Sequence, residues 1–135
     1  MKEQTRTFKE LLEIYIIIEG LYRKDEKLKD TKFGYAFKRF YKNNIDPTLK
    51  ERDEKLSDIR IKNALENKDT SAIITDSTNP RGYAYSKEGL LKCIKEETEL
   101  VEKYNKMEIK VEPYISSFVP ELSEEQRDIL KGLLI

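Results

Sequence analysis

Carboxylates are the side chains of this sequence that come in the numbers and spacing needed for acid–base or metal chemistry. Four glutamates fall between residues 96 and 102, and a second acidic pair lies at residues 53 and 54. Paired carboxylates can hold divalent metal ions or divide the roles of general acid and general base. The same glutamates are spaced for ion pairs with Lys92, Lys95 and Lys103 on an exposed helix face, and we favour this interpretation.

Histidine chemistry is excluded because the chain contains no histidine. This removes the histidine-dependent serine and cysteine triads together with the usual zinc sites. The single cysteine, Cys93, lies near Leu90 and Ile94 on one predicted helix face, so a buried structural thiol is favoured over a nucleophile. Five scattered glycines do not make a phosphate-binding loop. We therefore predict no catalytic residue, no cofactor and no metal site.

The segment KFGYAFKRFYKNN, residues 32–44, combines basic and aromatic side chains. Its cations include Lys38, Arg39 and Lys42, which could neutralise phosphates while the aromatic rings stack on bases. The apolar spacing also fits an amphipathic helix whose rings lie in the core and whose lysines face solvent, and this second interpretation is favoured.

The stretch DTSAIITDSTNPRGYAYSKEGL, residues 69–90, interrupts the helical pattern of the chain. Two runs of β-forming residues flank a cluster of turn formers, which predicts a short β-hairpin with Tyr83 and Tyr85 on one face. Arg81 at the tip could grip a phosphate or a carboxylate bidentately. Alternatively, Asn79 and its neighbours serve only to make the turn. Asn79, Arg81, Tyr83 and Tyr85 are the candidate interaction residues here.

Helices are expected to make up most of the N-terminal half. Apolar spacing predicts a helix over residues 7–22, and a short polar connection leads to a second helix that carries the aromatic segment. Asp46 and Pro47 predict a break or kink at residues 44–47, followed by a restarted helix. The charged arm Pro47–Asn67 could be half of a coiled coil whose partner lies in this chain or in another.

The C-terminal half mixes both kinds of secondary structure. We predict a helix that begins after Ser86, a strand within EIKVEPYI that could add a third strand to the hairpin, and a terminal helix with a capping box from Ser123 to Gln126. The predicted fold is α+β and predominantly helical, with a β-hairpin or three-stranded sheet. Residues 1–135 should form a single domain, comprising a helical hairpin with its arm (1–68) and a small α/β unit (69–135).

The overall charge gives no steering toward a charged partner. Twenty-six basic residues balance twenty-six acidic ones, so the net field attracts neither nucleic acid nor an anionic membrane. The apolar run near the N-terminus is interrupted by Glu10, Glu13 and Glu19, which argues against a signal peptide and a membrane span. A lone cysteine cannot form an intramolecular disulfide, and this favours a reducing, cytoplasmic compartment.

The region AIITDSTNPRGYAYSKEGLLKCIKEETELVEKYNKMEIKVEPYI, followed by LSEEQRDILKGLLI, resembles a family of small proteins of unknown function encoded in tailed-phage and prophage genomes. The similarity lies in the order of elements and implies no catalytic residues. It implies a non-enzymatic interaction protein located in the host cytoplasm or the virion: a virion or assembly component, or a modulator of a host protein.

Two surfaces are expected to carry this interaction, the charged arm and the tip from Asn79 to Gly82. The partner would be a second copy of the chain or a host or virion protein. The alternative function is a nucleic-acid-binding accessory protein that uses residues 32–44.

Overall fold

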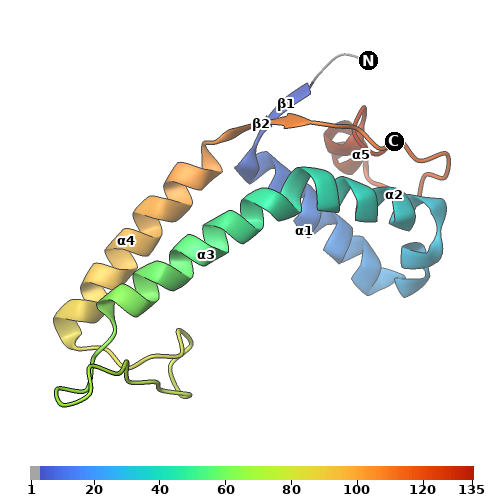
Figure 1. The fold of residues 1–135 in the computed structure, drawn as a ribbon. Helices are drawn as coiled ribbons and strands as arrows, with labels where there is room; N and C mark the ends of the chain where they lie inside the picture. The colour runs from blue at the N-terminus through green and yellow to red at the C-terminus, as the bar shows by residue number, and fades with distance from the viewer. Residues whose placement is uncertain (1–3) are drawn as a thin grey trace. The chain divides into compact units, whose positions relative to one another are not determined.

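The computed structural model describes residues 4–135 (Figure 1). The fold is α+β and predominantly helical, as predicted. The chain forms two compact units: one combines the described residues up to Leu49 with Asn105–Ile135, and the other is Lys50–Tyr104. The boundary near residue 68 that the sequence suggested therefore lies inside the second unit.

The first unit begins with α1, Phe8–Lys24, whose start is fixed by a capping box. The Glu10 amide donates to the Thr7 hydroxyl at 3.2 Å, and the Thr7 amide donates to the Glu10 carboxylate at 3.0 Å. These bonds satisfy two amides that the first helical turn leaves without partners.

None of the helices within residues 4–135 combines the length and apolarity needed to cross a bilayer.

A 3₁₀ helix, Glu26–Asp30, turns the chain into α2, Lys32–Phe40. The two elements approach so closely that a Cβ at Gly34 would overlap the carbonyl oxygens of Leu28 and Lys29. Thr31 caps α2 by accepting a hydrogen bond from the Gly34 amide at 3.3 Å. A residue without a side chain is therefore required where α2 begins.

The interruption predicted at residues 44–47 is present as a π-helical turn, Tyr41–Ile45, and not as a break. This turn joins α2 to α3, Asp46–Asn63, with Pro47 in the first turn of α3. Proline has no amide to donate, and a wider turn before it accommodates the missing bond without ending the helix. The turn contains two consecutive asparagines, Asn43 and Asn44, whose side chains form hydrogen bonds with a distant part of the same unit.

The sheet is two-stranded and antiparallel. Strand β1, Gln4–Thr7, pairs with β2, Glu108–Val111, in a register that sets Gln4 opposite Val111 and Thr7 opposite Glu108. The strand predicted within EIKVEPYI is thus confirmed, but the prediction that it adds a third strand to the 69–90 hairpin is wrong. Its partner is the N-terminal segment that precedes α1.

The C-terminal segment closes the core of the first unit. Helix α5, Glu124–Leu130, starts at the predicted Ser123–Gln126 capping box. Beyond it the chain bonds back to an extended segment, where the Tyr114 amide donates to the Leu133 carbonyl and the Ser116 amide to the Leu134 carbonyl, each at 2.8 Å. Fully buried side chains of this core include Phe8, Leu11, Ile18, Phe33, Phe40, Ile45, Leu130, Leu133 and Leu134.

In the second unit α3 lies beside α4, Lys87–Asn105 (Figure 1). The charged arm therefore has its helical partner within the same chain. Side-chain bonds join the two helices: Arg60 to Glu97 at 2.8 Å, Lys62 to Glu96 at 3.0 Å, and the Tyr104 hydroxyl to Glu51 at 2.9 Å. The buried apolar side chains described in this unit are Leu56, Cys93 and Tyr104, so polar contacts carry much of the packing.

The segment between α3 and α4 is more irregular than the predicted hairpin. Its antiparallel pairing is limited to isolated bridges, Glu66 with Ile73 and Thr75 with Tyr83. The predicted turn is present, with the Asp76 amide bonded to the Gly82 carbonyl at 3.0 Å and Gly82 at a φ of +85°. Glycine adopts this left-handed conformation at little steric cost, which explains its place at the turn.

Candidate interaction groove beside the π-helical turn

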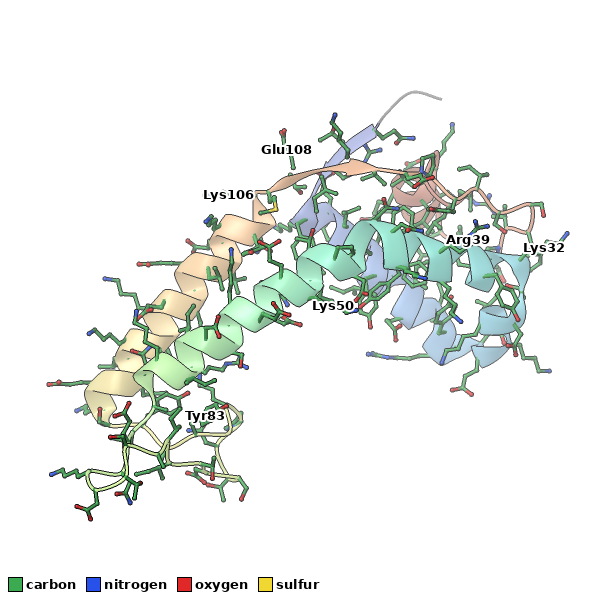
Figure 2. The ribbon with its side chains drawn as sticks, viewed as in Figure 1. Lys32, Arg39, Lys50, Tyr83, Lys106 and Glu108 are labelled. Atoms are coloured by element: carbon green, nitrogen blue, oxygen red, sulfur yellow. The ribbon has the colours of Figure 1, made fainter. Side chains whose placement is uncertain are left out.

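A groove in the first unit lies between α2 and the extended segment that follows β2. It encloses about 280 Å³. One wall is formed by Lys32, Tyr35, Ala36 and Arg39, and the other by residues 114–117. Figure 2 labels Lys32 and Arg39 on α2. Two turns of helix bring Lys32, Tyr35 and Arg39 onto the same face, because residues three and four apart are neighbours on a helix surface.

The two chain segments that form the groove carry cations without carboxylates. Residues 31–45 contain four Lys or Arg and no Asp or Glu, and residues 113–120 contain no charged residue at all. At the average acidic content of the chain, 26 residues in 135, two segments of this length would together hold about four carboxylates. Glu112 flanks the groove and interacts with the Tyr114 hydroxyl. A chain with no net charge thus concentrates positive charge here.

The π-helical turn fixes the far wall through Asn44. The Asn44 side chain is buried, donates to the Glu112 carbonyl at 2.8 Å and accepts from the Glu112 amide at 2.9 Å. A side-chain amide that makes both bonds imitates a strand partner and holds the chain just beyond β2. The start of the extended segment is therefore clamped to the turn.

Asn43 performs a second positioning role on the exposed side of the turn. Its side-chain amide donates to the Tyr114 hydroxyl at 2.7 Å and to the Arg39 carbonyl at 2.9 Å. The Arg39 guanidinium carbon lies 5.3 Å from the centre of the Tyr114 ring. Partial burial raises the pKa of Tyr114, the neighbouring Glu112 raises it further, and Arg39 opposes the shift.

Large apolar side chains continue from the groove along the same segment. Exposed fractions are 59% for Tyr35, 55% for Ile115, 44% for Phe118 and 41% for Val119. Such side chains cost free energy in water and gain it when a partner covers them. Apart from Tyr35, they lie within five consecutive residues, and Ile16 of α1, at 67%, is a further exposed apolar side chain of the unit.

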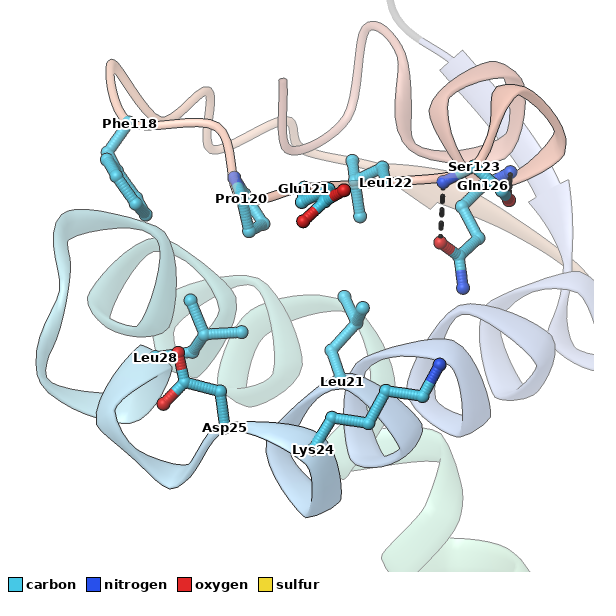
Figure 3. A pocket seen from close by; sticks show the side chains of 10 residues that line it. All are labelled: Leu21, Lys24, Asp25, Leu28, Phe118, Pro120, Glu121, Leu122, Ser123 and Gln126. Atoms are coloured by element: carbon cyan, nitrogen blue, oxygen red, sulfur yellow. Dashed lines mark hydrogen bonds between the residues drawn. The ribbon is translucent and has the colours of Figure 1, made fainter.

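A second hollow of about 680 Å³ lies between residues 118–123 and the end of α1 (Figure 3). Leu21 and Leu28 project into it from one side, and Phe118, Pro120 and Leu122 from the other. Lys24, Asp25 and Glu121 mix both signs of charge around its rim. The segment that forms one wall of the basic groove thus continues as the wall of a larger hollow with a mixed apolar and polar lining.

The structure assigns the basic and aromatic segment mainly to the core, which was the favoured interpretation. Phe33, Phe37 and Phe40 are buried and cannot stack on a ligand. Of the predicted cations, Arg39 lines the groove, whereas Lys38 and Lys42 are exposed outside it. Lys38 borders another hollow, which Tyr22 and Tyr35 also line.

Arg81 does not present its guanidinium at a free tip. Its Nε and a terminal nitrogen lie 2.9 and 2.8 Å from one oxygen of Glu97, while Arg60 contacts the other oxygen at 2.8 Å. Burial of Glu97 acts to raise the pKa of its carboxyl, but the bonds and charges of the two arginines outweigh it and lower the pKa. Arg81 is therefore part of an ion-pair network that fastens the irregular segment to the helices.

The other candidate residues of the segment between α3 and α4 are Asn79, Tyr83 and Tyr85, and they too have structural roles. The Asn79 side chain accepts from the Arg81 amide at 2.9 Å and shapes the turn. Tyr83 and Tyr85 are half-buried, and the Tyr85 hydroxyl donates to the Arg60 carbonyl at 3.0 Å. Burial, reinforced by Cys93 and Glu97, raises the pKa of Tyr85 to about 12. Cys93 itself is fully buried, as expected of a structural thiol.

Within residues 4–135 the ion pairs of the α4 glutamates join other parts of the chain, and not Lys92, Lys95 and Lys103 as their spacing indicated. Glu96 binds Lys62, and Glu97 binds Arg60 and Arg81. Across residues 4–135 no group of three or more histidine, cysteine, aspartate or glutamate side chains is arranged to hold a metal ion.

The sequence-based search missed Tyr114, Ile115 and the asparagine pair. The available signals were the Asn-Asn dipeptide before Asp46 and the apolar run YISSFV between two prolines, which suits neither a regular strand nor a helix. Comparisons with protein-family models, curated proteins and solved structures find no match to this chain.

Proposed function

We propose that this chain is a non-enzymatic interaction protein that binds a protein partner through the groove and its apolar continuation, Ile115–Val119. The observation that carries this proposal is the exposure of Tyr35 and Ile115 beside Arg39. Aromatic side chains and arginine are enriched at binding hot spots, where a few residues supply most of the affinity.

The groove is held in place before any partner arrives. Asn44 clamps the backbone at Glu112, and the C-terminal residues bond to Tyr114 and Ser116 from another direction. A surface that is already ordered loses less conformational entropy when it binds. This arrangement supports recognition better than it supports a purely architectural role for the segment.

The biological setting that we propose is that of a phage-associated protein, as the resemblance to phage and prophage proteins implies. The partner would be a virion or host protein, or a second copy of the chain. The charged arm and the tip from Asn79 to Gly82 are now less favoured as binding surfaces. Helix α4 covers part of the arm, and Glu97 pairs with Arg81 of the tip. The groove takes their place.

Selection from an unbiased library of displayed peptides tests the proposal. The folded protein is immobilised, and bound clones are counter-screened against a Tyr35→Ser/Ile115→Ser double variant. Loss of binding to this variant is expected for the enriched clones. A Lys38→Gln variant serves as the control, because Lys38 lies on α2 outside the groove. No enrichment, or equal binding to the double variant, would overturn the proposal.

Nucleic-acid binding remains the second candidate function, favoured by one specific observation. Lys32 and Arg39 share the groove with the rings of Tyr35 and Tyr114. Cations beside aromatic rings bind single strands with an affinity that falls steeply as salt rises. Mobility-shift assays with single- and double-stranded DNA and RNA at low ionic strength test this function, and the absence of any complex would exclude it.

A further inference from the structure

We infer that the occupant of the groove is an acidic peptide segment of a protein partner, carrying one aromatic or large aliphatic side chain as its anchor. This inference rests on the proposed function and adds the chemistry of the partner to it. It follows from the charge, the size and the hydrogen-bonding capacity of the groove.

The positive charge of the groove favours an acidic partner. Lys32 and Arg39 line one wall, and none of the residues that line the groove carries a carboxylate to neutralise them, although Glu112 lies at its edge. The Tyr114 ring lies against Arg39 and helps to orient its guanidinium. An oriented guanidinium offers paired N–H donors that match a carboxylate, and Lys32 adds a second positive charge about two helical turns away. Aspartate or glutamate side chains beside the anchor would satisfy both cations.

The volume of the groove favours a peptide that inserts a single large side chain as its anchor. A groove of about 280 Å³ is at the lower limit of small-molecule sites and suits one large side chain. Tyr35, Ala36 and Ile115 provide apolar contact surface within it. Burial of an aromatic or leucine-sized side chain there would favour binding, offset in part by the cost of ordering the peptide.

The rings argue for a peptide over a nucleic-acid strand. Successive bases need several free ring faces on which to stack. Phe33, Phe37 and Phe40 are buried, and Arg39 lies over the Tyr114 ring, so Tyr35 is the ring most available in the groove. The aliphatic side chains of Ile115 and Val119 add contact surface that suits a protein partner better than a base.

The backbone of the extended segment offers a further contact. The Tyr114 and Ser116 amides both bond to the C-terminal segment, so the Ile115 amide between them points away from it. Within the described part of the chain, Ile115 N–H has no hydrogen-bond acceptor. An extended peptide lying along this segment can supply one, as in recognition by strand addition.

Defined probes test the inference by fluorescence anisotropy. The first is a labelled peptide of about ten residues with one phenylalanine flanked by aspartates and glutamates. Its two matched controls replace the acids by asparagine and glutamine, or the phenylalanine by serine. The fourth probe is oligodeoxythymidylate of about twelve nucleotides. Each is titrated with the wild-type chain and with Lys32→Gln, Arg39→Gln and Lys38→Gln variants at about 50 and 300 mM NaCl.

The acidic anchored peptide should bind at least about tenfold more tightly than either control peptide, and Arg39→Gln or Lys32→Gln should weaken it by about tenfold. Lys38→Gln should change its affinity less than twofold. Equal binding of the uncharged peptide, tighter binding of the oligonucleotide, or no binding of the acidic peptide would overturn the inference. If library selection nevertheless yields clones that depend on Tyr35 and Ile115, the proposed function survives with a different partner chemistry.

Discussion

The guanidinium of Arg39 lies over the ring of Tyr114, with 5.3 Å between its central carbon and the ring centre. Asn43 bonds to both residues, through the Tyr114 hydroxyl and the Arg39 carbonyl. A cation held against the face of a ring is attracted by the negative potential of that face. This relationship joins two parts of the chain that are distant in sequence and orients the charge that lines the groove.

The two asparagines of the π-helical turn should separate binding from folding. Asn44→Ala removes two buried hydrogen bonds to Glu112, so we expect it to lower the free energy of unfolding by about 2 kcal/mol. Asn43→Ala alters an exposed pair of bonds and should leave the melting temperature nearly unchanged while weakening binding of the acidic peptide. Thermal melts and anisotropy check both variants. Equal destabilisation by the two substitutions would contradict the separate roles.

Alanine at two helical glycines should have opposite effects on stability. At Gly34 a Cβ would overlap the carbonyl oxygens of Leu28 and Lys29, so Gly34→Ala should destabilise the chain by at least about 2 kcal/mol. At Gly20, within α1, nothing lies within 4 Å of the added atom, and Gly20→Ala should stabilise the chain by about 0.5–1 kcal/mol. Urea unfolding measures both values. A neutral Gly34→Ala variant would mean that the 3₁₀ helix and α2 are not in close contact.

The ion-pair network of the second unit should make its stability depend on pH in the acid range. Because the pKa of Glu97 is lowered from its ordinary value of 4.5, its contribution is present above that value and is lost as the pH falls through the folded-state pKa. Glu97→Gln should reduce stability by about 2 kcal/mol at neutral pH, and the difference from wild type should shrink toward pH 3. Urea unfolding followed by circular dichroism at several pH values provides the measurement.

Arg81→Ala provides a second test of the same network. It should lower the melting temperature, because it removes two contacts to Glu97 and detaches the irregular segment from α4. Lys62→Ala is the matched control, since it breaks the more exposed pair with Glu96. An Arg81→Ala chain with unchanged stability would restore Arg81 as a candidate for partner recognition.

Cys93 should report opening of the second unit. Its side chain is fully buried, and burial together with Glu97 raises the pKa of the thiol, although Tyr85 and Arg81 oppose the shift. Reaction with a thiol-specific reagent at neutral pH should therefore be at least about a hundredfold slower than in urea, because it requires local unfolding. The Arg81→Ala variant should react faster. Rapid reaction of the native wild-type chain would show that the thiol is accessible.

Local patterns in the sequence predicted the elements that depend on neighbouring residues. Thr7 with Glu10 and Ser123 with Gln126 mark helix starts, since capping bonds span only three residues. The interruption before Pro47 and the turn at Gly82 follow from backbone chemistry in the same way. The burial of Phe33, Phe37 and Phe40 follows from helical periodicity. These features determined a predominantly helical α+β fold.

Tertiary structure alone decided which distant segments meet. The strand at Glu108–Val111 could have paired with any exposed edge, and its pairing with Gln4–Thr7 depends on how α1 packs in the first unit. Arg81 looked free because its partner, Glu97, is contributed by another element. Likewise, the groove exists because Asn43 and Asn44 reach Tyr114 and Glu112 across the fold. Side-chain pairing over such separations depends on the packed arrangement of the whole unit, which local propensity does not encode.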